Sequence, residues 1–272
     1  MRRALIFDCD GVVVDVEIQR HLRAFNQVWQ ELGIPWQWSD AEYVRALNVA
    51  GGRERLDRLR HNPSFRAAFD VPDDLTAWRR VIASWHQRKT QIYAEMVRSD
   101  DVVARRGVRR LAMEALAAGW RVAVATAGAR ESVTAVVRTA LGEDLAAEFT
   151  LITGESVRYK KPSPQVFDVT AAAIGVAPRN CIAIEDSRNG LLSATAAGMT
   201  CVITPTQLSF HDDFTEAALV VTGLGDPAGP PEVVLGGYVW TPARPYLRLG
   251  DLEELSLAAQ SRKSMAAAMA HY

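Results

Sequence analysis

Residues Ala4 to Glu17 read A-L-I-F-D-C-D-G-V-V-V-D-V-E. The apolar run from Ala4 to Phe7 has the length and continuity of a strand that is buried on both faces. It ends at two acids, Asp8 and Asp10, and Gly11 follows at once. Two carboxylates at the end of a buried strand repel each other and lose hydration, so the pattern predicts a cation between them. Mg2+, which prefers oxygen ligands, is the natural candidate.

The same two carboxylates are suited to chemistry. One could attack an electrophilic phosphorus atom while the other transfers protons. The alternative is an acidic turn after a strand, in which Gly11 supplies the bend. A D-x-D-G pattern is too short to decide between the two interpretations, so the decision falls to the rest of the chain.

Composition indicates an ordinary globular protein. The chain has 272 residues, 49% of them hydrophobic and 23% charged, with a net charge of −1. This balance favours neither nucleic acid nor a membrane surface as a partner, and no obligate protein partner is evident. No targeting or transmembrane segment is expected, because Asp8 and Asp10 interrupt the first apolar run. Three cysteines, expected on core strands, predict reduced thiols and a cytoplasmic location (Cys9, Cys181 and Cys201).

The region from residue 17 to residue 98 has helical spacing throughout and no credible strand. We therefore predict an all-helical cap domain over 17–98, inserted into a core formed by 1–16 and 99–259. Ser39 with Glu42 three residues later predicts a capping box, and Asp73 or Asp74 is expected to cap a long last helix. The predicted helices are 17–32, 39–47, 53–61 and 73–98.

From Val102 onward, short apolar strands alternate with helices, which predicts a parallel sheet covered on both faces. The fold class is therefore α/β, a doubly wound, Rossmann-like sheet with the helical cap inserted. Residues 223–245 hold five prolines and five glycines, too many for regular structure. Beyond this excursion a short run returns to the core, and 260–272 is expected to be a frayed tail. The predicted strands are 121–125, 149–153, 181–184 and 201–204, and the helices are 107–118, 131–141, 164–174 and 191–197.

Polar residues stand where each predicted strand ends. Thr126 follows one strand, Glu185 and Asp186 follow another, and Lys160 and Lys161 introduce a helix. Each has a plainer interpretation, as a helix cap, an acidic helix start or a solvated charge. Their coincidence at one edge of a doubly wound sheet favours a shared site, because such folds bind ligands there.

These motifs, in the order D-x-D-G-V, Thr, K-K-P-x-P and E-D-S-x-x-G, resemble those of the haloacid dehalogenase-like phosphohydrolases over about residues 4–221. The helical insert resembles their alpha-helical cap of the first type. W-x-W-S-D-A-E-Y from Trp36, A-G-G-R-E-R-L from Ala50 and H-D-D-F from His211 are similar to the CbbY group, which dephosphorylates xylulose-1,5-bisphosphate. The resemblance implies a Mg2+-dependent phosphatase whose partner is a small phosphorylated metabolite, a sugar phosphate or bisphosphate.

The resemblance also implies roles for individual residues. Asp8 would be the nucleophile that forms an aspartyl-phosphate, and Asp10 the general acid and base. Thr126 and Lys161 would hold the transferring phosphoryl group, with Lys160 as the rival to Lys161. Mg2+ would be held by Asp8, the backbone carbonyl of Asp10, Asp186 and, directly or through water, Glu185. Substrate contacts are expected from Gly11, Glu17 and Ala127.

The cap is expected to supply specificity. Gly51 and Gly52 expose backbone N–H groups at a helix start, and Arg53 adds a positive fork, which together suit the second phosphate of a bisphosphate. The alternative is a glycine turn between two cap helices, with its arginines solvated.

The chain departs from its resemblance at three places, one of which is the Pro/Gly-rich segment 223–245, which has no assigned role. Relatives often carry D-x-E-x-x-H after the first motif, but here Arg20 stands in the place of the histidine and His21 comes one residue later. The second motif continues with Ala127-Gly128-Ala129-Arg130, where small hydroxyl residues are expected. The changed histidine favours hydrolysis over the alternative, a beta-phosphoglucomutase-like isomerase.

Two further alternatives are weaker. A phosphonate hydrolase needs a cap lysine that forms a Schiff base, and the position of Lys89 on the long helix fits that role poorly. A catalytically silent binding module of this fold would normally lack Asp8, Asp10 or the lysine, and all three are present.

Overall fold

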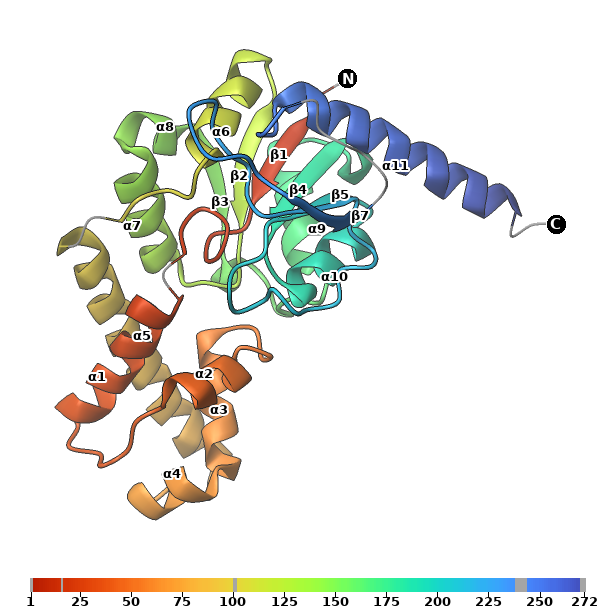
Figure 1. Cartoon of the computed structure of the whole chain (residues 1–272). Helices are drawn as coiled ribbons and strands as arrows, with labels where there is room; N and C mark the ends of the chain where they lie inside the picture. Colours follow the sequence, from red (N-terminus) through yellow and green to blue (C-terminus); the bar gives the residue numbers. More distant parts are fainter. Residues whose placement is uncertain (1, 16, 100–101, 238–243, 270–272) are drawn as a thin grey trace.

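The computed structural model describes residues 2–15, 17–99, 102–237 and 244–269. Figure 1 shows two parts, an upper one built around a β-sheet and a lower one made of helices. The chain enters the helical part after β1 (Ala4–Phe7) and returns along the long helix α5 (Leu75–Ser99). The predicted α/β fold with an inserted helical cap is confirmed.

The sheet places β1 at the point where the chain changes direction across it. Within the described residues it has seven strands in the order β3-β2-β1-β4-β5-β6-β7. Neighbouring strands are parallel except β6 and β7. β2 and β3 lie on one side of β1 and β4 on the other, so the carboxyl ends of β1 and β4 form the switch point at which open α/β sheets bind ligands. The strands after β1 are β2 (Arg121–Ala125), β3 (Phe149–Ile152), β4 (Cys181–Glu185), β5 (Thr200–Ile203), β6 (Leu219–Val221) and β7 (Val234–Gly237).

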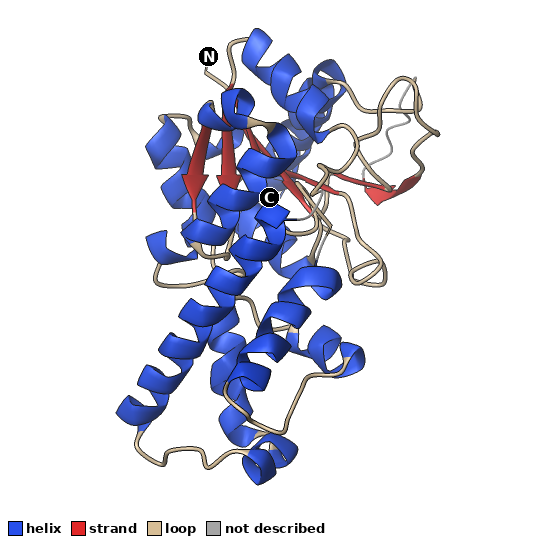
Figure 2. Ribbon diagram, turned by 90° about the vertical axis from the view of Figure 1, so that its left-hand side faces the viewer, coloured by secondary structure: helices blue, strands red, loops and turns tan. Residues whose placement is uncertain are grey.

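Helices cover both faces of this sheet, as Figure 2 shows. Ile6 of β1 packs in one apolar cluster with Phe167, while Phe7 points to the other face and packs in a cluster with Leu111 and Val136. Alternate residues of a strand point to opposite faces, so burial on both sides explains why the strands are apolar throughout. The helices are α6 (Val108–Ala117), α7 (Arg130–Leu141), α9 (Gln165–Ile174) and α10 (Arg188–Ala196).

The helical cap domain is held together by an aromatic core, and two of its helices begin with the N-terminal capping residues that the sequence predicted. The Ser39 and Glu42 side chains form the expected capping box, and the Asp74 carboxylate accepts a hydrogen bond from the backbone N–H of Ala77 at 2.7 Å, near the start of α5. Rings from four of the helices and their loops pack together (Phe25, Trp29, Trp38, Tyr43, Phe65, Trp78 and Trp85). The other cap helices are η1 (Glu17–Leu22), α1 (Arg23–Glu31), α2 (Asp40–Ala46), α3 (Gly52–Arg58), η2 (Leu59–His61) and α4 (Pro63–Ala68).

The first cap helix differs from the prediction in a way that matters for the site. Instead of one α-helix from Glu17 to Leu32, the segment Glu17–Leu22 is a π-helix and the α-helix begins at Arg23. A π-turn holds one residue more than an α-turn and is frequent at functional sites. His21 lies near the end of this π-helix, just before the α-helix begins.

Several shorter elements were not predicted from the sequence. They are α4, α8 (Glu143–Ala147), strand β6, and the 3-10 turns η3 (Gly154–Ser156) and η4 (Pro178–Asn180). Cys9 lies just after β1 and not within a strand, whereas Cys181 and Cys201 lie on strands as expected. All three cysteines are buried, and no disulfide joins them.

The C-terminal region corrects two expectations. The Pro/Gly-rich excursion 223–245 contains a strand, β7, which pairs with β6, although residues 238–243 lie outside the described part. The tail expected from Gln260 is wrong, because α11 (Leu249–Met269) continues past it and projects from the core in Figure 1. No helix of the described residues is both long and apolar enough to cross a membrane.

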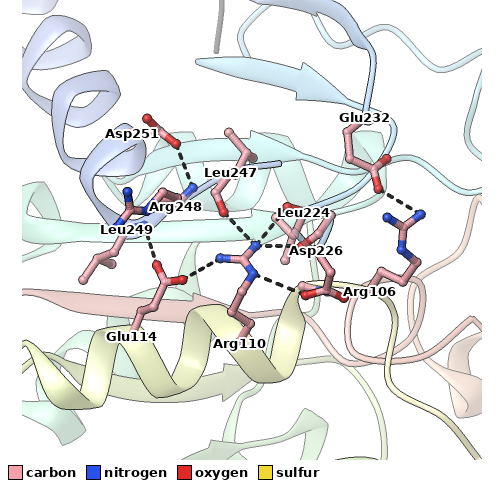
Figure 3. Close-up of polar contacts among 12 residues, drawn as sticks. Arg106, Arg110, Glu114, Leu224, Asp226, Glu232, Leu247, Arg248, Leu249 and Asp251 are labelled. Atoms are coloured by element: carbon pink, nitrogen blue, oxygen red, sulfur yellow. Dashed lines mark hydrogen bonds and ion pairs between the residues drawn. The ribbon is translucent and has the colours of Figure 1, made fainter. Parts of the chain in front are cut away.

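Arg110 on α6 anchors this C-terminal region to the core, as Figure 3 shows. Its guanidinium donates to the carbonyl oxygens of Gly225 and Leu247, both at 2.7 Å, and pairs with Glu114 at 2.7 Å. Glu114 in turn accepts from the backbone N–H of Leu249 at 3.0 Å. The polar contacts of Arg110 therefore hold this segment against the core, where its prolines and glycines leave little regular secondary structure.

Candidate active site

The predicted motif residues meet at one edge of the sheet. A pocket of about 500 Å³ lies between the core and the cap. Asp8 and Asp10 follow β1, Thr126 follows β2, and Asp186 follows β4; all four line the pocket, together with Lys161. The structure therefore brings these five side chains together at the switch point of the sheet.

Lys161 connects the two acidic motifs. Its ammonium group donates to Asp8 Oδ1 at 2.6 Å, to the carbonyl oxygen of Ala125 at 3.0 Å, and to Glu185 Oε1. All three charged groups are buried. A buried ion pair of this kind persists only when every partner is satisfied, so the ammonium holds Asp8 and Glu185 in fixed positions.

Asp8, Glu185 and Asp186 form a group that could hold a metal ion. One carboxylate oxygen from each lies within 4.8 Å of the others. Two glycines allow this approach: a Cβ on Gly11 would lie 2.2 Å from Asp186 Oδ2, and a Cβ on Gly190 would lie 1.9 Å from Glu185 Oε2. The glycines of D-x-D-G and E-D-S-x-x-G therefore make room for the acidic side chains.

Burial and mutual repulsion govern the protonation of this acidic group. Burial raises the pKa of Asp8, although Lys161 opposes the change. Burial also raises the pKa of Glu185 to about 7, and burial with the charges of Asp8 and Glu185 raises the pKa of Asp186 well above its ordinary value. The pKa of Lys161 is raised, because Asp8 and Glu185 outweigh the burial that would lower it. A cation bound between the carboxylates would relieve this repulsion.

Asp10 faces the cap, where a chain of hydrogen bonds reaches it. His21 Nε2 lies 3.0 Å from Asp10 Oδ1, and His21 Nδ1 lies 2.5 Å from Lys89 Nζ. An ammonium can only donate, so Nδ1 accepts and Nε2 carries the hydrogen that is donated to Asp10. The His21 ring also stacks on Tyr93, with ring centroids 4.0 Å apart. His21 and Lys89 are both buried, so this chain from α5 to the carboxylate is shielded from water.

These contacts keep Asp10 ionised. Burial alone would raise its pKa, but the hydrogen bond from His21, with the nearby charges of Lys89 and Arg55, lowers the pKa of Asp10 to about 2. Asp8 and Asp10 are only two residues apart, yet their pKa values are shifted in opposite directions. Such a separation assigns different tasks to two neighbouring carboxyl groups.

The loop after β2 closes another side of the pocket. Thr126 is buried, its backbone N–H donates to the carbonyl of Ile152 at 3.1 Å, and its hydroxyl accepts from the N–H of Gly128 at 3.2 Å. Ala127 lines the pocket beside it. Thr126 and Ala127 therefore form this side of the pocket, without the small hydroxyl residues that were expected after Thr126.

The remaining predicted residues divide between pocket and periphery. Gly11, Gly51 and Gly52 line the pocket, whereas Arg53 is exposed and is not among its lining residues. Lys160 is not among them either; its ammonium donates to the carbonyl of Gly154. Glu185 lies beneath the pocket, fully buried, and meets it through Lys161. The side chain of Glu17 lies outside the described part of the chain.

The pocket lining also includes basic side chains of the cap that were not proposed for the site from the sequence, among them His21, Arg55, His86 and Lys89. Arg55 takes the place expected for Arg53, and its guanidinium donates to the Tyr43 hydroxyl at 2.9 Å and to the carbonyl of Val49 at 3.0 Å. Lys89, which the sequence analysis considered only as a Schiff-base lysine, lines the pocket and contacts His21. The available signal was spacing, since residues 82, 86, 89 and 93 recur at helical intervals and share one face of α5.

The chain is also similar to known proteins. A model of the haloacid dehalogenase-like hydrolase family matches residues 2–198. CbbY from Cupriavidus necator is 39% identical over 231 residues, which cover 84% of this chain and 88% of that protein.

Two solved structures of CbbY from Rhodobacter sphaeroides also match, each covering 84% of this chain and 97% of theirs. The complex with phosphate has a TM-score of 0.75 at 33% identity. A variant in complex with xylulose-1,5-bisphosphate has a TM-score of 0.75 at 32% identity.

Proposed function

Because the chain belongs to the haloacid dehalogenase-like hydrolases and is a CbbY-like phosphatase, we propose that it hydrolyses a small sugar phosphate through an aspartyl-phosphate on Asp8. A sugar bisphosphate such as xylulose-1,5-bisphosphate is the leading candidate substrate, since a related CbbY was solved with that compound. The observation that carries the mechanism is the 2.6 Å hydrogen bond from Lys161 to Asp8 at the carboxyl end of β1.

Asp8 is the proposed nucleophile. Its carboxylate comes directly off the strand end and lines the pocket, while Lys161 fixes one of its oxygens. A dianionic phosphate approaches an anionic nucleophile only where positive groups offset the repulsion. Lys161 supplies one such charge, and Thr126 with the backbone after β2 would hold the phosphoryl oxygens as the bond from phosphorus to the leaving oxygen breaks.

Mg2+ is the proposed cofactor, and the residues present fit it. Asp8, Asp186 and Glu185 offer only oxygen donors, they cluster within 4.8 Å, and they carry more negative charge than Lys161 neutralises. Asp8, Asp186 and the backbone carbonyl of Asp10 would hold the ion, with Glu185 behind them. When bound, Mg2+ would offset the charge of the phosphoryl oxygens and of the acidic group.

Asp10 is the proposed general acid and base. With its pKa lowered to about 2, the carboxylate is ionised before substrate binds, which is the form that accepts a proton from water. The acid step needs the protonated form, and a phosphate dianion beside Asp10 would raise its pKa toward that form. His21 would hold the carboxylate in place in both steps, because its Nε2–H donates to Oδ1.

The cap side of the pocket is the proposed site of a second phosphate. Arg55, His21 and Lys89 present donors or positive charge there, and Gly51 and Gly52 leave backbone exposed. A bisphosphate that spans cap and core would use its remote phosphate to favour closure and exclude water. The contact with the second phosphate that was expected from Arg53 would be made by Arg55, because Arg55 lines the pocket.

Hydrolysis is preferred over phosphoryl return to a sugar for a different reason than the sequence offered. The displaced histidine no longer argues against a mutase, because the π-turn brings His21 to Asp10. The preference rests instead on the CbbY relatives.

The test uses the purified protein, Mg2+ and three substrates: a sugar bisphosphate, the matching monophosphate and an aryl phosphate. We expect Mg2+-dependent phosphate release that is fastest on the bisphosphate and is abolished by a chelator. Asp8→Asn should abolish both turnover and covalent phosphorylation, whereas Asp10→Asn should leave slow phosphorylation of Asp8. Phosphate attached to Asp10, or turnover by Asp8→Asn, would contradict the assignment.

A further inference from the structure

Arg105 is a half-buried cation behind the candidate active site, outside the residues that line the pocket. It lies in the second linker between cap and core, after the end of α5 and before α6 begins at Val108. Its backbone N–H donates to the carbonyl of Val13 at 2.8 Å, which ties the linker to the loop that carries Asp8 and Asp10. Burial lowers the pKa of its guanidinium, so the fold accepts an energetic cost at this position.

The guanidinium gathers backbone carbonyls from two strand ends. It donates to the carbonyl of Gly11, in the loop after β1, and to the carbonyl of Thr204 at 2.9 Å and of Pro205 at 3.4 Å, after β5. It also donates to the Thr204 hydroxyl at 3.2 Å. β1 and β5 are the two neighbours of β4 in the sheet. Arg105 therefore bridges the loops on either side of the strand that carries Glu185 and Asp186.

Through Gly11, the contacts of Arg105 affect the positions of the proposed metal ligands. The Asp186 carboxylate packs so closely on Gly11 that a Cβ there would lie 2.2 Å from its Oδ2. Gly11 follows Asp10 directly, so a shift of the Gly11 carbonyl moves the Asp10 carbonyl as well. A group that fixes the Gly11 peptide thereby sets the distance between two proposed ligands from different strands.

We propose that Arg105 is a positioning residue for the Mg2+ site: its fork of donors holds the D-x-D-G loop against Asp186 by joining the Gly11, Thr204 and Pro205 carbonyls. This inference rests on the proposed function, since it assumes that a cation binds among these carboxylates. It assigns a task to the arginine that no sequence motif had singled out.

Charge and geometry predict opposite signs for the loss of Arg105. A cation near Asp186 repels a second cation, so if Arg105 acted only by its charge, its removal would tighten metal binding. If it acts by holding the loop, its removal lets the ligands spread and weakens metal binding. Lysine keeps the charge but lacks the planar fork that reaches several carbonyls at once.

The experiment is a titration with Mn2+ in the absence of substrate, followed by the electron paramagnetic resonance signal of the free ion, with Mg2+ as competitor. It compares the unsubstituted protein with Arg105→Met, Arg105→Lys and a control, Arg106→Met. Arg106 is the next residue of the linker, but it is exposed and contacts Pro230 and Glu232 instead of the site (Figure 3).

We expect Arg105→Met and Arg105→Lys each to weaken Mn2+ and Mg2+ binding about tenfold, and Arg106→Met to leave it unchanged. Tighter or unchanged binding in folded Arg105→Met would overturn the inference, and so would equal weakening in Arg106→Met. Should Arg105→Met fail to fold, Arg105→Lys decides the question, because it retains the stem and the charge. Absence of binding by the unsubstituted protein would instead refute the metal site itself.

Discussion

The two halves of the active site are built by different means. In the core half, Asp8, Glu185 and Asp186 come from strand ends, and Lys161, from the loop before α9, joins Asp8 and Glu185 through buried ion pairs. The cap half (His21, Arg55, His86 and Lys89) comes from helices and meets the core at Asp10. The carboxyl ends of parallel strands lie side by side at one edge of the sheet. A residue on a helix reaches the site only if its position around the helix axis faces that site.

The packing beneath the two halves differs in the same sense. Strands β1, β2 and β4 are packed with Ala, Val, Ile and Leu, which fit tightly between sheet and helices. The cap instead packs tryptophan against other rings, with Trp29 and Trp38 edge-to-face at 5.0 Å and Trp78 and Trp85 at 5.8 Å. Large rings fill the space between short helices that have no ladder of hydrogen bonds to join them.

The largest expected effect breaks the core half. Asp186→Ala removes one of three clustered carboxylates, so we expect kcat/KM at fixed Mg2+ to fall at least about a hundredfold on every substrate, with partial recovery at high Mg2+. Steady-state assays over a Mg2+ series measure this. Asp213→Asn, an acid at the pocket edge outside the cluster, is the matched control. An unchanged Mg2+ dependence in Asp186→Ala would remove Asp186 from the ligands.

The next effect tests the link between the halves. His21→Gln should lower kcat about 10- to 100-fold on all substrates, because Asp10 loses its positioned partner. Since His21 lowers the pKa of Asp10 to about 2, its removal should also move the acidic limb of the pH–rate profile to higher pH. Lys89→Met should act in the same direction. A lowered kcat with an unmoved acidic limb would mean that His21 serves only the packing around Tyr93.

A smaller and selective effect tests the cap half. Arg55→Met should lower kcat/KM about tenfold on a bisphosphate and much less on an aryl phosphate, because only the former extends to the cap. Arg53→Ala is the paired variant, since Arg53 is exposed outside the pocket. A selective loss in Arg53→Ala but not in Arg55→Met would return the phosphate contact to Arg53. Equal losses on both substrates would mean that these arginines merely support the cap.

The smallest effect concerns stability of the cap. Burial, with the positive charges of Lys89, Arg53 and Lys160, lowers the pKa of His86 to about 3. The unfolded chain therefore binds a proton more readily, so this contribution to stability is complete above the ordinary histidine pKa and is lost as the pH falls toward 3. Between pH 7 and pH 5 the loss should be on the order of 1 kcal/mol, reduced by the partial exposure of the ring. His86→Asn should flatten the fall of the melting temperature over that range; an identical fall would assign the acid sensitivity elsewhere.

The sequence by itself determined the fold class and the core half of the site. Unbroken apolar runs such as Ala4–Phe7 identify strands buried on both faces, and their alternation with helices fixes a doubly wound sheet. In that topology every strand's carboxyl end meets the same edge, so residues next to strand ends, such as Asp8, Thr126 and Asp186, are neighbours whatever their distance in the chain. A local sequence pattern is enough to predict that these residues are neighbours, because the parallel pairing of the strands brings their ends together.

Only the tertiary structure showed how the cap half, the C-terminal region and the surroundings of the proposed metal ligands are arranged. The π-helix Glu17–Leu22 carries His21 to Asp10, and helix phase brings Arg55 instead of Arg53 to the pocket; neither feature has a signal in composition or periodicity. β7 forms because β6 offers it an edge, against the tendency of its glycines. Arg105 has no motif, and its importance comes only from the carbonyls that folding gathers around it. Interactions that depend on side-chain direction and on distant backbone groups are set when the elements pack, and no local pattern records them.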